Sequence, residues 1–196
     1  MTCSIPLAIA KGETFEYAFR IATPTPVLKP ITSIGRTAPA TLTVPGHGLT
    51  DAWPFRIEGI TAPADLNSPA SDPTQAYLAR VADPDTLTLA DVNGLGFKAF
   101  AGTAAVIRYL GAEDLTGLAA RLIVRKSAGG AVADTFLSGD GQLSVDKATA
   151  TVAINLSAVA TAALTWTQGV YDLQLFDPLN LATVIGIASG RITAGT

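Results

Sequence analysis

The chain has 196 residues, of which 48% are apolar and 15% are charged, and its formal net charge is −3. The apolar fraction excludes a disordered chain, and the acidic balance argues against nucleic acid as a partner because phosphate binding needs clustered Lys and Arg. With Cys3 as the single Cys and His47 as the single His, an internal disulfide framework and a Cys/His zinc site are also excluded. We expect a folded protein without a metal or a cofactor.

The N-terminal region carries no pattern that predicts export or membrane insertion. Its apolar run at 5–10 is interrupted by Pro6 and has no basic residue before it. The run is too short for the core of a signal peptide and far too short to span a bilayer. We therefore expect a protein made in the cytoplasm that stays there or travels in a larger particle.

The first regular element is predicted over residues 14–21. One face of this segment holds Phe15, Tyr17, Phe19 and Ile21. The positions between them are mostly polar, and this period of two is typical of a half-buried strand.

Residues 23–30 interrupt the pattern. The segment TPTPVLKP has three prolines in eight positions, and it cannot continue a central strand because proline donates no backbone hydrogen bond. We place a domain boundary at its end. The block that follows is rich in Thr, Pro and Gly and contains short strand candidates at 31–36, 40–44, 54–59, 75–81, 86–90 and 104–110.

Longer alternating strands are predicted after residue 110. They lie at 118–125, 149–156 and 170–176. Only residues 157–164 have helical character, with Ser157 as the N-terminal cap. One face of that helix is expected to hold Leu156, Val159, Ala160, Ala163 and Leu164.

This order of elements predicts an all-β protein with one short helix. The N-terminal segment offers two strands at most, which are too few to fold alone. We therefore expect a discontinuous β-sandwich from residues 1–30 and 111–196, interrupted by an inserted β-barrel at 31–110. Such an insertion is tolerated when its two ends emerge close together at the surface.

The flanking segments resemble a family of tailed-phage structural proteins that includes the N-terminal domain of phage baseplate upper proteins. The shared sequence motifs are KGETFE at 11–16, DLTG at 114–117 leading into ARLIVR at 120–125, and VYDLQL at 170–175. Further matches are a Gly-Gly hairpin, the LSAVATAAL helical turn and the closing string GRIT at 190–193. The resemblance covers about 105 residues and implies a sandwich that docks into a tail, baseplate or fibre assembly.

The inserted block resembles a second phage module, a small barrel named for the first catalytic-cysteine half-domain (FCCH) of ubiquitin-activating enzymes. Its most specific sequence motif is TVPGHGL at 43–49, which is accompanied by FRIEGI at 55–60 and DTLTL at 85–89. In phages the module is a structural insert. The chain departs from the pattern at 68–74, where the usual loop is lengthened and Pro-rich, and Cys3 lies outside the block, so no thioester chemistry is expected.

The resemblance implies a non-enzymatic virion component from the tail tip, baseplate or fibre-attachment region. Its partners would be other phage structural proteins and further copies of itself in a ring or trimer, and the insert would touch another subunit or the host surface. The alternatives are a capsid decoration or head–tail connector protein, or a module that binds host glycans. The last of these needs two or three exposed aromatic side chains on one concave face.

The residues able to support catalysis are sparse. His47 is flanked by glycines, and the interpretation we prefer is a turn residue bonded to nearby backbone; Cys3 is expected to be inert. The remaining candidates are aspartates, which are also common turn residues. They are Asp72, Asp83, Asp85, Asp134, Asp140 and Asp146. We expect no catalytic residue and no metal ligand among them.

Aromatic side chains of the inserted block are the candidates for an interface. We assign this role to Trp53, Phe55, Phe97 and Phe100. Trp53 adjoins Pro54 in a predicted loop, where it would either anchor a partner or fill the core. The basic residues Arg121, Arg125 and Lys126 are expected to form a solvated face.

Overall fold

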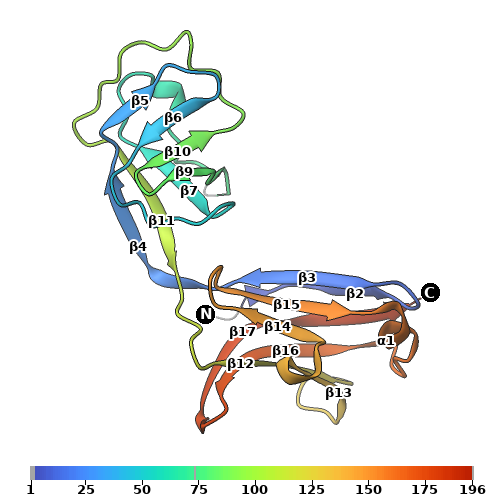
Figure 1. The fold of residues 1–196 in the computed structure, drawn as a ribbon. Helices are drawn as coiled ribbons and strands as arrows, with labels where there is room; N and C mark the ends of the chain where they lie inside the picture. The colour runs from blue at the N-terminus through green and yellow to red at the C-terminus, as the bar shows by residue number, and fades with distance from the viewer. Residues whose placement is uncertain (1–2, 73, 196) are drawn as a thin grey trace. The chain divides into compact units, whose positions relative to one another are not determined.

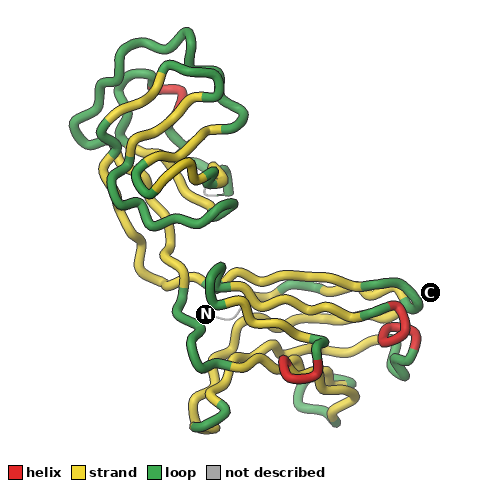
Figure 2. The backbone as a smooth tube through the Cα atoms, viewed as in Figure 1, coloured by secondary structure: helices red, strands yellow, loops and turns green. Residues whose placement is uncertain are grey.

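The computed structural model describes residues 3–72 and 74–195, which form two compact units. The flanking unit takes its described residues from Met1–Ile21 and Ala112–Thr196, and the inserted unit from Ala22–Gly111. Strands dominate both units and the helical segments are short (Figure 2). The expectation of an all-β fold with one short α-helix is confirmed for the described residues.

The flanking unit contains two sheets that face each other (Figure 1). The large sheet has the order β1-β17-β16-β12-β13, with β2 also beside β17, and the small sheet has the order β14-β15-β3. The strands of the large sheet are β1 (Cys3–Ser4), β2 (Leu7–Ala10), β12 (Ala119–Arg125), β13 (Val132–Leu137), β16 (Gln168–Asp177) and β17 (Asn180–Gly195). Those of the small sheet are β3 (Phe15–Arg20), β14 (Leu143–Asp146) and β15 (Thr151–Leu156).

Strand alternation places the core of this unit between the two sheets. In β12, in β15 and over Tyr171–Leu175 of β16, every second residue is at most 1% exposed. These residues are Ala120, Leu122, Val124, Val152, Ile154, Leu156, Tyr171, Leu173 and Leu175. The register sets Leu122 opposite Leu173, so the buried faces of neighbouring strands coincide. The predicted alternation of these three strands is confirmed, whereas Tyr17 of β3 is 36% exposed rather than buried.

The single α-helix, α1 (Ala158–Ala162), begins where the sequence predicts. The Ser157 hydroxyl accepts a hydrogen bond from the Ala160 N–H at 3.2 Å. The predicted apolar face is wrong in part, because Val159 is 81% exposed and Thr161 is buried. The Thr161 hydroxyl donates to the Glu13 carbonyl at 2.7 Å and accepts from the Gly12 N–H at 3.1 Å, so a polar anchor sets the rotation of the helix.

The inserted unit consists of two four-stranded sheets. Their orders are β5-β6-β10-β9 and β4-β11-β7-β8. The strands are β4 (Ala22–Pro30), β5 (Ser33–Gly35), β6 (Ala40–Thr43), β7 (Pro54–Glu58), β8 (Tyr77–Leu78), β9 (Val81–Asp83), β10 (Thr86–Leu89) and β11 (Val106–Ala112). Two 3₁₀ turns, Ala64–Leu66 in this unit and Ser138–Asp140 in the flanking unit, complete the chain. The strand expected over 75–81 is interrupted, since β8 ends at Leu78 and β9 begins at Val81.

The boundary between the units lies at Ala22 rather than after residue 30. The Pro-rich segment forms β4, which pairs with β11 of the inserted unit and occupies the edge of its sheet. Pro24, Pro26 and Pro30 follow one another at steps of two and four positions, so their missing N–H groups lie on one side of the strand. Proline is tolerated at a sheet edge, and the composition break therefore marks an edge strand and not a linker.

The Pro-rich segment that begins at Ser68 is held by one side chain of β7. The Arg56 guanidinium donates hydrogen bonds to the carbonyl of Asp72 at 2.8 Å and to that of Gln75 at 3.1 Å, and it also bonds the Pro69 carbonyl. Arg56 thus satisfies three backbone carbonyls of this segment, in addition to the backbone hydrogen bonds that the segment makes itself.

We predict that Leu122→Ala lowers the free energy of unfolding of the flanking unit by about 2–5 kcal/mol, because it leaves a cavity between the sheets. Chemical denaturation followed by the fluorescence of Trp166, the tryptophan of this unit, measures the change. Ile123→Ala, one residue away on the opposite face of β12, is the matched control and should cost much less. Equal losses for the two variants would contradict the assignment of the buried face.

Candidate interaction surfaces

The outer face of the large sheet is defined by the strand positions that alternate with the core. On β12, β16 and β17 it includes Arg121, Ile123, Arg125, Val170, Asp172, Gln174, Phe176, Val184, Ser189 and Arg191, and on β13 it includes Val132, Thr135 and Leu137. In register, Ile123 lies beside Asp172, and Asp172 beside Ser189. Three arginines against one aspartate give this face a formal charge of +2 in a chain whose net charge is −3. The face also carries large apolar side chains.

The outer face of the small sheet is different in kind. Its residues are Glu16, Ala18, Arg20, Ser144, Asp146, Thr151, Ala153 and Asn155. They are small or polar, and their formal charge is −1. Such a face is suited to water, whereas the outer face of the large sheet combines apolar side chains with arginine, the composition favoured at protein interfaces.

Two arginines of the outer face are fixed by neighbouring groups. The Arg121 Nε donates to the Gln174 Oε1 at 2.8 Å, and its guanidinium carbon lies 5.3 Å from the centre of the Phe176 ring. The Arg125 Nη1 donates to the Gly130 carbonyl at 3.2 Å. A guanidinium held in this way loses little further freedom when it binds a carboxylate, so these two side chains are positioned for carboxylate binding.

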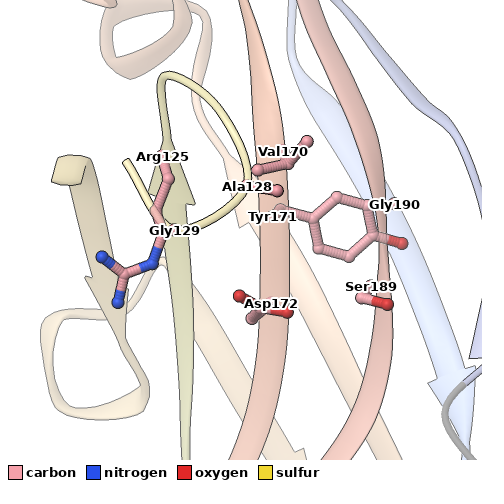
Figure 3. A pocket seen from close by; sticks show the side chains of 8 residues that line it. All are labelled: Arg125, Ala128, Gly129, Val170, Tyr171, Asp172, Ser189 and Gly190. Atoms are coloured by element: carbon pink, nitrogen blue, oxygen red, sulfur yellow. The ribbon is translucent and has the colours of Figure 1, made fainter. Parts of the chain in front are cut away.

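A shallow depression of about 620 Å³ lies at one end of this face (Figure 3). It is lined by Arg125, Ala128, Gly129, Val170, Tyr171, Asp172, Ser189 and Gly190. The Tyr171 hydroxyl donates to the Ile5 carbonyl at 2.8 Å and serves the fold. Figure 3 shows a cation, a carboxylate and a hydroxyl around the hollow, from Arg125, Asp172 and Ser189. These groups can receive a polar side chain of a partner.

A second depression, of about 910 Å³, lies in the inserted unit between β8, β9 and β10. Its acid Asp51 accepts a hydrogen bond from the Val81 N–H at 2.7 Å, which ties this carboxylate to the backbone. Burial raises the pKa of Tyr77, and its hydroxyl donates to the Leu66 carbonyl at 3.1 Å. The Asp51 carboxylate and the Tyr77 hydroxyl therefore stabilise the fold of the inserted unit through bonds to its backbone.

His47 is 1% exposed and bonded through both ring nitrogens. The Leu49 N–H donates to Nδ1 at 3.0 Å, so Nδ1 carries no proton and Nε2–H donates to the Asp83 carbonyl at 3.0 Å. Its own carbonyl accepts from the Tyr109 hydroxyl. The preferred interpretation of His47 as a backbone-bonded turn residue agrees with this geometry.

We predict that His47→Ala destabilises the inserted unit by about 1–3 kcal/mol, because it leaves the buried Leu49 N–H without its acceptor. The unfolding transition reported by Trp53 measures the loss. The transition reported by Trp166 in the flanking unit is the internal control and should keep its midpoint. An unchanged Trp53 transition would mean that water replaces both ring contacts.

The four aromatic interface candidates do not form a surface cluster. Trp53 is 3% exposed and Phe55 1% exposed, so both are core residues and their assignment to an interface is corrected. The Trp53 Nε1 donates to the Leu110 carbonyl at 2.7 Å, and the Phe55 ring stacks on Tyr77 at 5.7 Å. Phe97 and Phe100 are half-buried in the segment between β10 and β11.

The aspartates singled out in the sequence are mostly turn residues. Asp83 accepts from the Asp85 N–H at 2.8 Å, and Asp85 accepts from the Gly46 N–H at 2.7 Å. Hydrogen bonds from Thr74 hold the pKa of Asp72 below its ordinary value. The Trp166 Nε1 donates to Asp134 at 3.4 Å. Across residues 3–72 and 74–195, no three His, Cys, Asp or Glu side chains come together as a metal site.

Asp146 offers a direct test of these turns. The Thr149 hydroxyl donates to its Oδ2 at 2.7 Å and the Ala148 N–H to its Oδ1 at 2.9 Å, and these bonds lower the pKa of Asp146 below 3.8. Because the pKa is lower in the folded chain, the stability that the carboxylate contributes is present above pH 3.8 and is lost as the pH falls through the folded pKa.

Thr149→Val is expected to raise the pKa of Asp146 toward its ordinary value, as measured by NMR titration of the side-chain carboxyl carbon. Thr149→Ser keeps the hydroxyl and is the control, with an unchanged titration. A low pKa that persists in the valine variant would assign the effect to the backbone donors alone.

Comparisons with known proteins give no family for this chain. No protein-family profile matches it, and no curated protein is similar in sequence. Among the residues that the structure describes, no helix has the length and apolar content needed to cross a bilayer.

Sequence reasoning missed the outer face as a unit. It identified Arg121 and Arg125 as one solvated strand face, but their neighbours come from segments about 50 and 65 residues further along the chain. For β16, the alternating pattern of the sequence did indicate its outer positions, because the polar residues fall on one face of the strand. β17 was not predicted, because Gly186 and Gly190 interrupt its pattern.

Proposed function

We propose that the chain is a structural component of a tailed-phage virion, located at the tail tip, baseplate or fibre-attachment region, and that it acts by protein–protein assembly. The observation that carries the proposal is the contrast between the two outer faces of the sandwich. One face is small and polar, and the other combines apolar side chains with positioned arginines. The resemblance of the flanking segments to phage baseplate proteins supplies the biological setting.

In this function the outer face of the large sheet docks on an acidic surface of a neighbouring virion protein. Arg121 and Arg125 pair with its carboxylates while Ile123, Val170 and Phe176 are buried against it. Charge pairs of this kind fix orientation and steer association, and apolar burial supplies most of the affinity. The inserted unit contacts another subunit or the host surface, several copies form a ring or trimer, and no turnover or cofactor is involved.

Two alternatives differ in what supports them. A capsid decoration or head–tail connector protein would use the same assembly chemistry at another place in the particle. A glycan-binding module needs exposed aromatic rings, and among the described aromatic residues only Tyr17 is exposed, at 36%. The assembly function is therefore the better supported.

The double variant Arg121→Glu/Arg125→Glu tests the docking face. We expect binding to purified tail particles to weaken at least about tenfold, because acidic side chains would oppose a partner surface that is itself acidic. Co-sedimentation of the purified chain with particles that lack it measures the binding. The control Thr151→Glu/Ala153→Glu adds two acids to the outer face of the small sheet and should bind normally. Absence of the wild-type chain from virions, or tighter binding by the double variant, would overturn the proposal.

A further inference from the structure

Strand β17 has one segment whose second edge has no partner among the described strands. On one side, β17 pairs with β16 between Asn180 and Thr193, with register shifts between Asn180 and Val184 and at Ile187. On its other side, its described partners β1 and β2 pair with it only from Ala188 onward. No described strand lies against residues 182–186 on that second side. All five of these residues are exposed, including Val184 at 42% and Ile185 at 45%. The β16–β17 hairpin is drawn in orange and red in Figure 1.

The other sheet edges among the described strands carry features that discourage pairing with another chain. Charges, prolines and short length are the usual means. In the flanking unit β3 carries Glu16 and Arg20, β13 carries Asp134, β14 carries Asp146, β1 has two residues, and β2 has four residues between Pro6 and Lys11. In the inserted unit β4 carries three prolines, and β5, β8 and β9 have three residues or fewer.

The segment 182–186 carries neither charge nor proline. Its residues 184–186 pair with β16 in regular register, and the register shifts on either side of them. No charged residue occurs between positions 178 and 190, and the sequence Ala-Thr-Val-Ile-Gly contains three β-branched residues in succession. Its free edge presents backbone N–H and C=O groups at the spacing of a strand, and only another extended strand satisfies all of them at once. The surface therefore fits a strand rather than a helix or a small molecule.

We propose that this edge pairs antiparallel with the same segment of a second copy of the chain, about a two-fold axis at Val184. In this register Ala182 faces Gly186 of the second copy, Thr183 faces Ile185, and Val184 faces its own equivalent. Small residues meet small ones and β-branched residues meet each other, the pairing that stabilises antiparallel strands, and no like charges are opposed. The two large sheets then become one continuous sheet.

This inference adds a two-fold contact between copies to the ring or trimer of the proposed function, and it rests on the proposed function only for its biological purpose. The self-pairing is a property of the isolated chain in solution. Binding to tail particles is a separate measurement, so either proposal can fail while the other stands.

Val184→Lys tests the pairing, because the two-fold axis brings the two introduced ammonium groups face to face. Sedimentation velocity of the full chain over a range of concentrations measures self-association. We expect a dimer for the wild type and at least about tenfold weaker dimerisation for Val184→Lys, through loss of the Val–Val contact and like-charge repulsion. The matched control is Val132→Lys on β13, the opposite edge of the same sheet, where the replaced valine is 50% exposed. This variant should dimerise as the wild type does.

Near-UV circular dichroism checks that each variant is folded, and hydrogen exchange locates the contact. The amides of 182–186 should exchange more slowly in concentrated wild-type protein than in dilute protein. A wild-type chain that stays monomeric at every concentration would overturn the proposal. So would a dimer that Val184→Lys leaves intact, a dimer that Val132→Lys disrupts instead, or exchange at 182–186 that does not depend on concentration.

Discussion

The structure depends on pairing between segments that lie at opposite ends of the chain. β3 completes the small sheet by pairing with β15, and β2 joins β17, over separations of about 135 and 185 residues. The inserted unit itself lowers the entropic cost of closing such long loops, because its first and last strands, β4 and β11, are neighbours in one sheet. The Glu113 N–H donates to the Ile21 carbonyl at 3.0 Å, so the flanking unit is joined again directly after the insertion.

The sequence predicts those parts of the fold where one strand face is buried without interruption. The alternation of Val152, Ile154 and Leu156 predicts both the strand and its buried face, because the period of two is a direct consequence of strand geometry. The domain boundary could not be predicted from the prolines of β4, since proline signals an edge strand as strongly as a linker. Trp53 and Phe55 illustrate a second limit, because an aromatic residue beside a turn packs inward or outward according to tertiary contacts that composition does not encode.

The two proposed contacts use different parts of one sheet. Val184 belongs both to the outer face and to the free edge, because it pairs with Phe176 of β16 while its opposite side has no described partner. Pairing along the edge extends the sheet sideways and leaves the arginines of the outer face available. Docking through that face buries side chains and uses few backbone groups. A dimer formed at β17 would therefore present two copies of the arginine face to the rest of an assembly.

The polar groups of the chain also bear on catalysis. A general acid at neutral pH needs a raised pKa, and a general base needs a free lone pair directed at a substrate. The pKa values of Asp72, Asp114 and Asp146 are instead lowered by threonine and backbone donors, which keeps these carboxylates ionised. The one unprotonated ring nitrogen of His47 already accepts a hydrogen bond from the Leu49 N–H. Groups of this kind fix turns, and the rigid turns in turn hold the strands whose faces and edge are the surfaces proposed for assembly.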